Sequence, residues 1–413
     1  MRPIAFVSCR YRLGVSKWVP YFIICVVMNI NFESATGTWQ LQRWPLNQHN
    51  SSLQAWDAAD ELLISHASQA IASFITTHQR QPKVLIINDS YGALSCALAD
   101  CQQTQINDSL LAAQGTLYNR EQNNLPSQQL KQLTSLETYP SADIVLLKLP
   151  NNHSYLQYIL QQLATVATPE TLIFASAKAK DITRNVMAMF EQTLGPSSAS
   201  LTVKKCRLIQ SQFNPDLTPM KQVEFPLIWP LEHTNFKVIN HANVFSREKL
   251  DLGARVFLKH LPQIAEQKTV IDLGCGNGVI GLKLLQLNSN IKLILTDESY
   301  MAIESARQTI ASNLPEKLAQ CDFVIDDCLQ QQADKSADYI LCNPPFHQQQ
   351  EVTRHIANKM FLDAKRVLKQ GGYFRIVANR HLNYNEVLQR LFGNCRLLAT
   401  GPKFVILEAI KRS

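Results

Sequence analysis

The sequence predicts two tandem α/β domains, each built on a mostly parallel β-sheet. Its 413 residues exceed what one ordinary hydrophobic core accommodates, so two domains are expected. From Val84 onward, short apolar runs alternate with longer amphipathic runs, which is typical of strands that alternate with helices. This alternation occurs twice along the chain and therefore indicates two domains of the same class.

Two ungapped pairs of segments support a duplication. Residues 83–98 (KVLIINDSYGALSCAL) align with residues 269–284 (TVIDLGCGNGVIGLKL), and both predict a strand, a tight turn and a helix. Residues 141–152 (SADIVLLKLPNN) align in the same way with residues 336–347 (SADYILCNPPFH). Buried strands also resemble one another by chance, but two matches in the same order favour an internal duplication.

These patterns divide the chain into four segments. Residues 1–27 carry four basic and no acidic residues. The apolar run after the last of these basic residues, Trp18 to Met28, is too short to span a bilayer. We predict that translation starts at Met28 and that residues 1–27 are an upstream extension, with a signal-peptide core as the alternative. Residues 28–225 are the first predicted domain, residues 226–242 a proline-containing linker, and residues 243–413 the second domain.

Composition excludes some classes of protein and leaves the binding partner open. With 46% hydrophobic and 18% charged residues, the chain is expected to be folded throughout. The net charge of +7 falls to +3 without residues 1–27, so overall charge does not predict nucleic-acid binding. The ten cysteines form no C-x-x-C pair, so we expect no metal site and a reducing, cytoplasmic location without membrane attachment.

A glycine-rich turn, DLGCGNG (Asp272 to Gly278), is the first motif that carries chemistry. It follows a buried strand and leads into a helix near Gly278, an arrangement that brings bare backbone close to a ligand. Asp297 ends the next predicted strand and is placed to accept hydrogen bonds from two ribose hydroxyls. The turn also matches the dinucleotide fingerprint G-x-G-x-x-G, so NAD is an alternative adenosine-containing cofactor.

The motif NPPF (Asn343 to Phe346) decides between the cofactors, because an amine methyltransferase uses it and a nicotinamide enzyme does not. In a sheet of order 3-2-1-4-5, the strand before Asn343 lies beside the glycine-turn strand. An exocyclic amine is a poor nucleophile, and the Asn343 side-chain oxygen with the Pro344 carbonyl would accept from its N–H bonds and stabilise the growing positive charge. Phe346 would stack on the flat ring.

The predicted site therefore belongs to an S-adenosylmethionine-dependent methyltransferase. Asp327, with Asp326 as an equal candidate, is expected to accept from the adenine amine, His347 to contact the substrate or take up the released proton, and residues 243–255 to close over the methionine end. Cys275 is expected to be a small filler of the turn. The predicted catalytic residues are Asn343, Pro344, Pro345 and Phe346, and the predicted cofactor-binding residues are Asp272, Gly274, Cys275, Gly276, Asn277, Gly278, Asp297, Asp327 and Asn343.

The first copy lacks these features. Ile86, Asn88 and Ser90 stand where the second copy has Asp272, Gly274 and Gly276, and KLPN (148–151) replaces NPPF. Side chains at these positions would occupy the space in which a ligand approaches backbone. We therefore predict that the first domain has lost the chemistry and orients a large substrate.

The second domain resembles the bacterial ribosomal RNA guanine-N2 methyltransferases, and several stretches resemble the large-subunit branch. The resemblance implies two Rossmann-like class I methyltransferase domains with mostly parallel seven-stranded sheets, the N-terminal one degenerate. It also implies 23S ribosomal RNA as partner, N2-methylguanosine as product, no stable protein partner, and Arg380 with Phe346 and His347 as substrate contacts. The stretches are LQRWP (41–45), LQAWDAADE (53–61), NVFSREKLDLGAR (243–255), CNPPFHQQ (342–349), IVANRHLNY (376–384) and FGNC (392–395).

Three other functions are weighed against this one. A glutamine-N5 protein methyltransferase of the release-factor type also uses N-P-P with an aromatic residue, but a small helical domain would precede its catalytic domain. DNA adenine methylation is compatible with the tetrad alone. A non-enzymatic RNA-binding assembly factor would keep the fold, yet it has no use for an intact second-copy motif.

Overall fold

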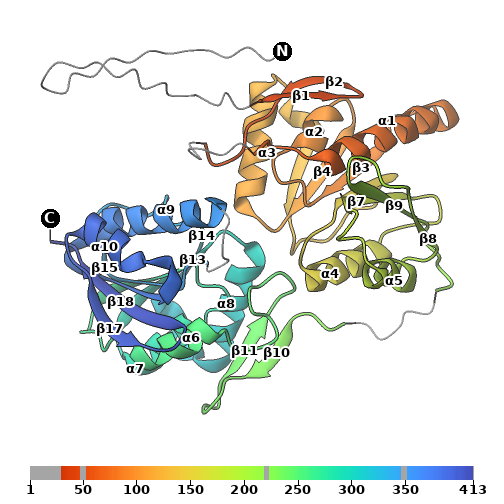
Figure 1. Ribbon diagram of the computed structural model, residues 1–413. Coiled ribbons are helices and arrows are strands. Elements are labelled where there is room, and N and C mark those ends of the chain that lie inside the picture. The colour runs from red at the N-terminus through yellow and green to blue at the C-terminus, as the bar shows by residue number, and fades with distance from the viewer. Residues whose placement is uncertain (1–28, 47–52, 218–222, 346–350, 413) are drawn as a thin grey trace, which may run out of the picture.

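The computed structural model describes residues 29–46, 53–217, 223–345 and 351–412, which form two α/β domains in contact with each other (Figure 1). Each domain contains a mostly parallel seven-stranded sheet flanked by helices, as predicted. The expectations for residues 1–27, Phe346 and His347 lie outside the described residues. None of the described helices is long and apolar enough to cross a bilayer, and no cluster of potential metal ligands occurs among the described residues.

The first domain has the strand order β5-β4-β3-β6-β7-β9-β8, with β9 antiparallel to β7 and to β8. Its strands are β3 (Lys83–Ile87), β4 (Gln102–Asn107), β5 (Leu130–Thr134), β6 (Ile144–Lys148), β7 (Leu172–Lys178), β8 (Ser197–Ala199) and β9 (Cys206–Ser211). The helices are α1 (Ala58–His78), α2 (Ala93–Ala97), α3 (Leu110–Gln122), α4 (His153–Ala164), α5 (Arg184–Thr193) and the 3₁₀ turn η1 (Ser127–Gln129). A hairpin of β1 (Asn31–Ser34) and β2 (Gly37–Gln40) precedes them.

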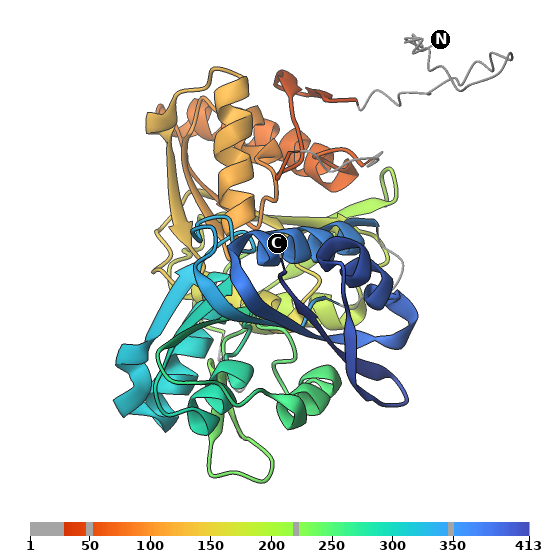
Figure 2. The ribbon, with the colours of Figure 1, turned by 90° about the vertical axis from the view of Figure 1, so that its left-hand side faces the viewer.

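The second domain repeats this order as β14-β13-β12-β15-β16-β18-β17. Its strands are β12 (Lys268–Leu273), β13 (Ile291–Asp297), β14 (Cys321–Ile325), β15 (Ala337–Cys342), β16 (Leu368–Asn379), β17 (Arg396–Thr400) and β18 (Phe404–Ile410). The helices are α6 (Leu252–Phe257), α7 (Val279–Leu287), α8 (Tyr300–Asn313), α9 (Glu351–Val367) and α10 (Tyr384–Phe392), with 3₁₀ turns η2 (Leu258–His260), η3 (Pro315–Gln320) and η4 (Arg380–Leu382). Figure 2 shows this sheet, from teal to blue, below the orange part of the first domain.

Equivalent glycines begin equivalent helices in the two domains. Gly92 and Gly278 each precede the helix that follows the central strand, with φ of 81° and 75°, a left-handed conformation that glycine adopts without strain. A Cβ at either position would lie within 3 Å of another helix backbone, at Thr116 Cα in the first domain and Ala306 Cα in the second. The shared strand order and the shared close helix contact support the duplication.

Residues 226–242, expected to be a linker, form an antiparallel hairpin of β10 (Leu227–Pro230) and β11 (Lys237–Asn240). The hairpin packs on α8 of the second domain, where the Ile239 amide donates to Thr309 Oγ1 at 3.0 Å and the Lys237 amide donates to Asn313 Oδ1 at 2.9 Å. Val238 is fully buried in the second domain's core. This segment is therefore part of the second domain, because its apolar residues find partners there.

Candidate active site

A cavity of about 620 Å³ opens where the two domains meet, at the carboxyl ends of the parallel strands of the second domain. Strand register puts the predicted site residues there. Leu273 lies opposite Thr296 on one side and Cys342 on the other, so the glycine turn, Asp297 and Asn343 leave three neighbouring strands at the same edge. This is the topological switch point, where open α/β sheets bind their ligands.

The glycine turn presents backbone to the cavity. Gly274 and Gly276 have φ of 71° and 54°, and the amides of Gly274 and Cys275 both donate to the Thr296 carbonyl at 2.9 Å. A Cβ built on Gly276 would meet no described atom within 4 Å, so that position faces open cavity space. Cys275 is almost fully buried, and burial raises the pKa of its thiol well above the ordinary value, which fits a filler and not a nucleophile.

Asp297 connects this turn to the next helix. Its Oδ2 accepts from the Gly276 amide at 3.0 Å and its Oδ1 from the Ser299 amide at 3.1 Å. Burial raises the pKa of this carboxyl, although the two amide donors oppose that effect. A fixed acceptor beside exposed glycine backbone fits the ribose of an adenosine-containing cofactor.

Two of the residues predicted to bind the cofactor, Asp272 and Gly278, do not line the cavity. They stabilise the glycine turn through contacts inside the domain. Asp272 is fully buried, its Oδ2 accepts from the Gly281 amide at 3.0 Å, and burial raises its pKa to about 7. Gly278 permits the close contact between α7 and α8, because its Cβ would lie 2.8 Å from the Ala306 backbone. Gly274, Cys275, Gly276 and Asn277 do line the cavity.

The end of β15 supplies Asn343, Pro344 and Pro345 to the cavity wall. The Asn343 Nδ2 donates to Asp251 Oδ2 at 3.2 Å, which fixes the orientation of the amide. Its Oδ1 is buried and has no partner among the described residues. A buried carbonyl oxygen without a donor is costly, so this atom marks the place where a ligand N–H is expected.

The contact with Asp251 leads to a testable prediction. Asp251 also caps α6, because its Oδ2 accepts from the Ala254 amide at 2.8 Å. Replacement Asp251→Ser keeps a capping group but is too short to hold Asn343, so kcat is expected to fall about tenfold while the melting temperature stays nearly constant. Asp251→Asn keeps an acceptor oxygen and serves as the matched control. Equal kcat for Asp251→Ser and the wild type would show that the Asp251 contact does not orient Asn343.

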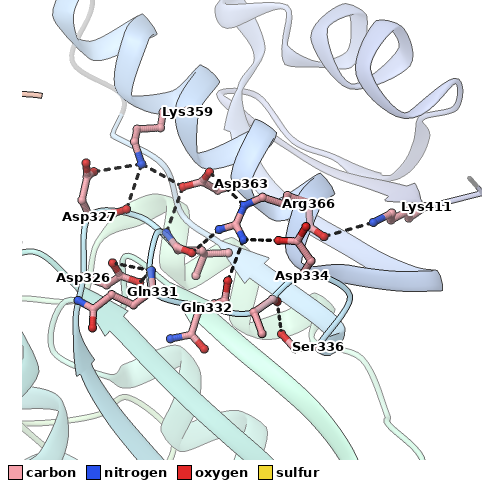
Figure 3. A network of polar contacts seen from close by, with 12 residues as sticks. Asp326, Asp327, Gln331, Gln332, Asp334, Ser336, Lys359, Asp363, Arg366 and Lys411 are labelled. Carbon is pink, nitrogen blue, oxygen red and sulfur yellow. Dashed lines mark hydrogen bonds and ion pairs between the residues drawn. The ribbon is translucent and has the colours of Figure 1, made fainter. Parts of the chain in front are cut away.

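Both candidate adenine acceptors line the cavity, in a polar network that Figure 3 shows. Asp326 accepts from the Gln331 amide at 3.0 and 3.2 Å through its two carboxylate oxygens. Asp327 lies 3.5 Å from Lys359 Nζ, which also contacts Asp363 at 3.0 Å. Both aspartates therefore remain candidates, and Lys359 is a cavity residue that sequence reasoning missed, since no motif surrounds it.

The first domain forms the opposite wall of the cavity with Arg43, Trp44 and Tyr91. The Arg43 guanidinium lies over the Tyr91 ring, 4.8 Å from its centroid, and Trp44 Nε1 donates to Gln114 Oε1 at 3.1 Å. Sequence reasoning gave these residues no role, although Arg43 and Trp44 belong to the stretch LQRWP. Arg380, predicted to contact substrate, is exposed and is not among the residues that line the cavity.

In the first domain, the residues at positions equivalent to Gly274 and Asn343 are Asn88 and Lys148, and both contact other residues of that domain. Lys148, at the end of β6, forms ion pairs of 2.7 Å with Asp57 and with Asp60. Asn88 keeps a positive φ of 64° and donates to the Lys148 carbonyl at 2.9 Å. Asp89 accepts from the amides that begin α2, including Gly92 at 3.0 Å. These contacts agree with the prediction that the first domain has lost cofactor binding, which stays a prediction.

The raised pKa of Glu298, which lies beside Asp297, leads to a prediction of how the free energy of unfolding depends on pH. Burial raises its pKa from 4.5 to about 7, and the charges of Asp297 and Asp108 act in the same direction. Because the folded-state pKa exceeds the unfolded one, the folded protein binds more protons between these values, and the free energy of unfolding falls as pH rises through this range. Replacement Glu298→Gln is expected to reduce this fall by up to about 3 kcal/mol.

Denaturant unfolding at pH 4.5 and pH 8 measures this effect. Replacement Glu304→Gln in the same helix region is the control, because Arg307 lowers the pKa of Glu304. The control variant should keep the full fall of the wild type. If the free energy of unfolding of Glu298→Gln falls as much as that of the wild type between pH 4.5 and pH 8, burial does not raise the pKa of Glu298 as described.

Comparisons with known proteins now identify the family. Residues 29–215 match the family model described as "RLMG N-terminal domain", and residues 235–408 match "Methyltransferase small domain". The chain is 46% identical over 389 residues to ribosomal RNA large subunit methyltransferase G of Pseudoalteromonas translucida, covering 94% of this chain and 99% of that protein. The chain belongs to this family. The family's protein from Klebsiella pneumoniae (strain ATCC 700721 / MGH 78578) is 44% identical over 373 residues, covering 90% and 96% of the two chains.

A solved structure has the same fold over nearly the whole length of this chain. The 16S rRNA N2 G1207 methyltransferase of T. thermophilus, in complex with AdoMet and guanosine, superposes with a TM-score of 0.70 and covers 92% of this chain and 97% of its own. The two sequences are 18% identical, so the likeness concerns the tandem-domain fold. Family membership confirms a methyltransferase with S-adenosylmethionine as cofactor, and it disfavours the NAD alternative.

Proposed function

We propose that the protein transfers a methyl group from S-adenosylmethionine to the exocyclic N2 of a guanine in 23S ribosomal RNA. The observation that carries this proposal concerns Asn343, which lines the cavity beside the glycine turn and whose buried Oδ1 has no partner among the described residues. The substrate class is supported by the large-subunit methyltransferase G relatives, which cover nearly the whole chain. Cytoplasmic location would follow from this substrate.

The site residues fit a methyl transfer to an amine. The cofactor would supply, when bound, a methyl carbon on positively charged sulfur. Transfer would leave neutral S-adenosylhomocysteine, and the methylated nitrogen would lose one proton to solvent. The glycine turn and Asp297 hold the adenosine end of the cofactor, and Asp326 or Asp327 accepts from its adenine amine. The Asn343 Oδ1 and the Pro344 carbonyl accept from the two N–H bonds of the guanine amine, which orients the nitrogen lone pair and stabilises the positive charge that develops on nitrogen.

The first domain is proposed to orient the RNA. Its wall of the cavity combines a cationic side chain, Arg43, with the aromatic rings of Trp44 and Tyr91. Base stacking on aromatic side chains tolerates any base, and a guanidinium attracts the phosphate backbone. Such a wall suits the nucleotides around a guanine that must leave its stack to reach Asn343.

The architecture disfavours the main enzymatic rival. A glutamine-N5 methyltransferase of the release-factor type would carry a small helical domain ahead of the catalytic one, whereas a second seven-stranded α/β domain precedes it here. No feature of the described residues favours DNA adenine methylation over guanine methylation.

Labelled S-adenosylmethionine tests the proposal directly. The protein is incubated with separated 16S RNA, 23S RNA and release factor, and the labelled species are digested to nucleosides or amino acids. Label in N2-methylguanosine from 23S RNA alone is the expected result. Label in protein, in 16S RNA or in another nucleoside would overturn it, and no transfer to any acceptor would support the assembly-factor alternative.

A further inference from the structure

The two domains join through equivalent segments that follow equivalent strands. Residues 107–110 (NDSL) begin with the last residue of β4 and residues 297–300 (DESY) begin with the last residue of β13. Ser109 and Ser299 pair in an antiparallel bridge. The Leu110 amide donates to the Glu298 carbonyl at 2.9 Å, and the Tyr300 amide donates to the Asp108 carbonyl at 3.0 Å. The two bonds are reciprocal, so each segment contacts the equivalent segment of the other domain in the same way.

Asp108 of the first domain is the centre of this interface. The residue is 4% exposed, and its carboxylate accepts four hydrogen bonds. One comes from its own domain, from Ser135 Oγ at 2.7 Å. The other three come from beyond it, from Ser299 Oγ at 2.6 Å, the Met301 amide at 2.9 Å and Asn243 Nδ2 at 2.8 Å. Four donors satisfy both oxygens, so the carboxylate acts as a fixed anchor.

The anchored segment is the one that positions Asp297. The Ser299 amide donates to Asp297 Oδ1, and Ser299 Oγ, held by Asp108, also accepts from the Ala302 amide at the start of α8. Ser109 Oγ donates to the Glu298 carboxylate, and Met301 is fully buried in the core cluster of the first domain. Asp297, Glu298 and Ser109 all line the cavity, so the domain interface is also a wall of the cofactor site.

We propose that the first domain is a working part of the cofactor site, with Asp108 and Ser109 as positioning residues that hold the segment 297–301 and thereby Asp297. This inference rests on the proposed function, because it assumes that Asp297 binds the ribose of S-adenosylmethionine. It gives the degenerate domain a role in cofactor affinity, separate from its proposed role in orienting RNA. By thermodynamic reciprocity, cofactor binding strengthens the contact between the two domains.

Asp108→Asn is the most direct test, because it keeps the shape of the side chain but turns one acceptor into a donor that faces donors. The dissociation constant for S-adenosylmethionine, measured by calorimetry without RNA, is expected to rise roughly tenfold, within the range of ordinary coupling between sites. The methylation kcat at saturating cofactor is expected to stay within about threefold. Ser109→Ala, which loses one bond across the interface, should shift the dissociation constant in the same direction by less.

Asp60→Asn is the matched control. Asp60 is a buried carboxylate of the same domain, but it pairs with Lys148, and neither of these two residues is among those that line the cavity. This variant should lose stability yet keep the cofactor affinity of the wild type. Unchanged affinity in folded Asp108→Asn, or an equal loss of affinity in Asp60→Asn, would overturn the proposal. If Asp108→Asn does not fold, Ser109→Ala provides the same comparison.

Hydrogen exchange of the unaltered protein gives an independent readout. The Leu110 amide donates across the interface, so its exchange is expected to slow when S-adenosylhomocysteine, a non-reactive probe, is bound. Unchanged exchange at this amide would contradict the coupling. This inference alone is refuted if the wild type methylates 23S RNA, its Leu110 amide exchanges at an unchanged rate with the probe, and Asp108→Asn keeps the cofactor affinity of the wild type. The proposed function is refuted if the wild type does not bind the probe.

Discussion

Replacement Asn343→Ala is expected to lower kcat by on the order of 10²- to 10³-fold, the effect typical of removing one preorganised group that faces developing charge. The reason is that Asn343 lines the cavity, that its buried Oδ1 lacks a partner among the described residues, and that the bond from its Nδ2 to Asp251 fixes the amide. S-adenosylmethionine affinity is expected to change less than about threefold, because the glycine turn and Asp297 remain. Single-turnover methylation with 23S RNA and calorimetry with the cofactor measure the two quantities.

A structural asparagine provides the control for this prediction. Asn394 lies outside the cavity lining and uses its amide to donate to the Ile410 carbonyl at 2.8 Å and to accept from the Ile410 amide at 2.9 Å. Asn394→Ala should lower the melting temperature without lowering kcat at a temperature where the protein is folded. Undiminished transfer by Asn343→Ala would refute the proposed mechanism. It would also remove the basis for expecting a lower kcat in Asp251→Ser.

The parts of the site that the sequence predicts are those in which one short segment carries the chemistry. The glycine turn must follow a buried strand, and NPPF must follow the neighbouring one, so strand order alone brings Gly276 and Asn343 together. The duplication was also visible, because Gly92 and Gly278 face the same steric demand from an adjacent helix. Even Asn88 fits this pattern, since asparagine tolerates the positive φ of the glycine it replaces.

The remaining site residues depend on tertiary packing that no local pattern encodes. Asp251 lies 92 residues before Asn343, and their contact forms within the second domain because α6 packs near the end of β15. Asp108 lies 191 residues before Ser299, and their contact forms where the two domains meet. Prolines near residues 226–242 favoured a linker, yet the apolar residues of this segment bury themselves on α8 as a hairpin. In this segment, burial against the second domain overrode the local signal of the prolines.

Replacement Gly276→Ala is expected to raise the dissociation constant for S-adenosylmethionine by roughly one to two orders of magnitude. Gly276 has a φ of 54°, lines the cavity, and would direct a Cβ into space that no described atom occupies within 4 Å. That space is where the cofactor is expected to approach bare backbone, and a methyl group forced into filled space typically costs about 1–3 kcal/mol. Calorimetry with the cofactor measures the change.

Backbone strain has to be separated from this steric effect, and Gly393 allows the separation. Gly393 has a φ of 73°, and its Cβ would also meet nothing within 4 Å, but it ends α10 and does not line the cavity. Both alanine variants should lose roughly 1–2 kcal/mol of stability, since both force a side chain into the left-handed region. Only Gly276→Ala should lose cofactor affinity. Equal affinities in the two variants would mean that the turn does not contact the cofactor. The side chain of Ser90, at the equivalent position of the first domain, would then no longer explain why that domain is predicted to have lost cofactor binding.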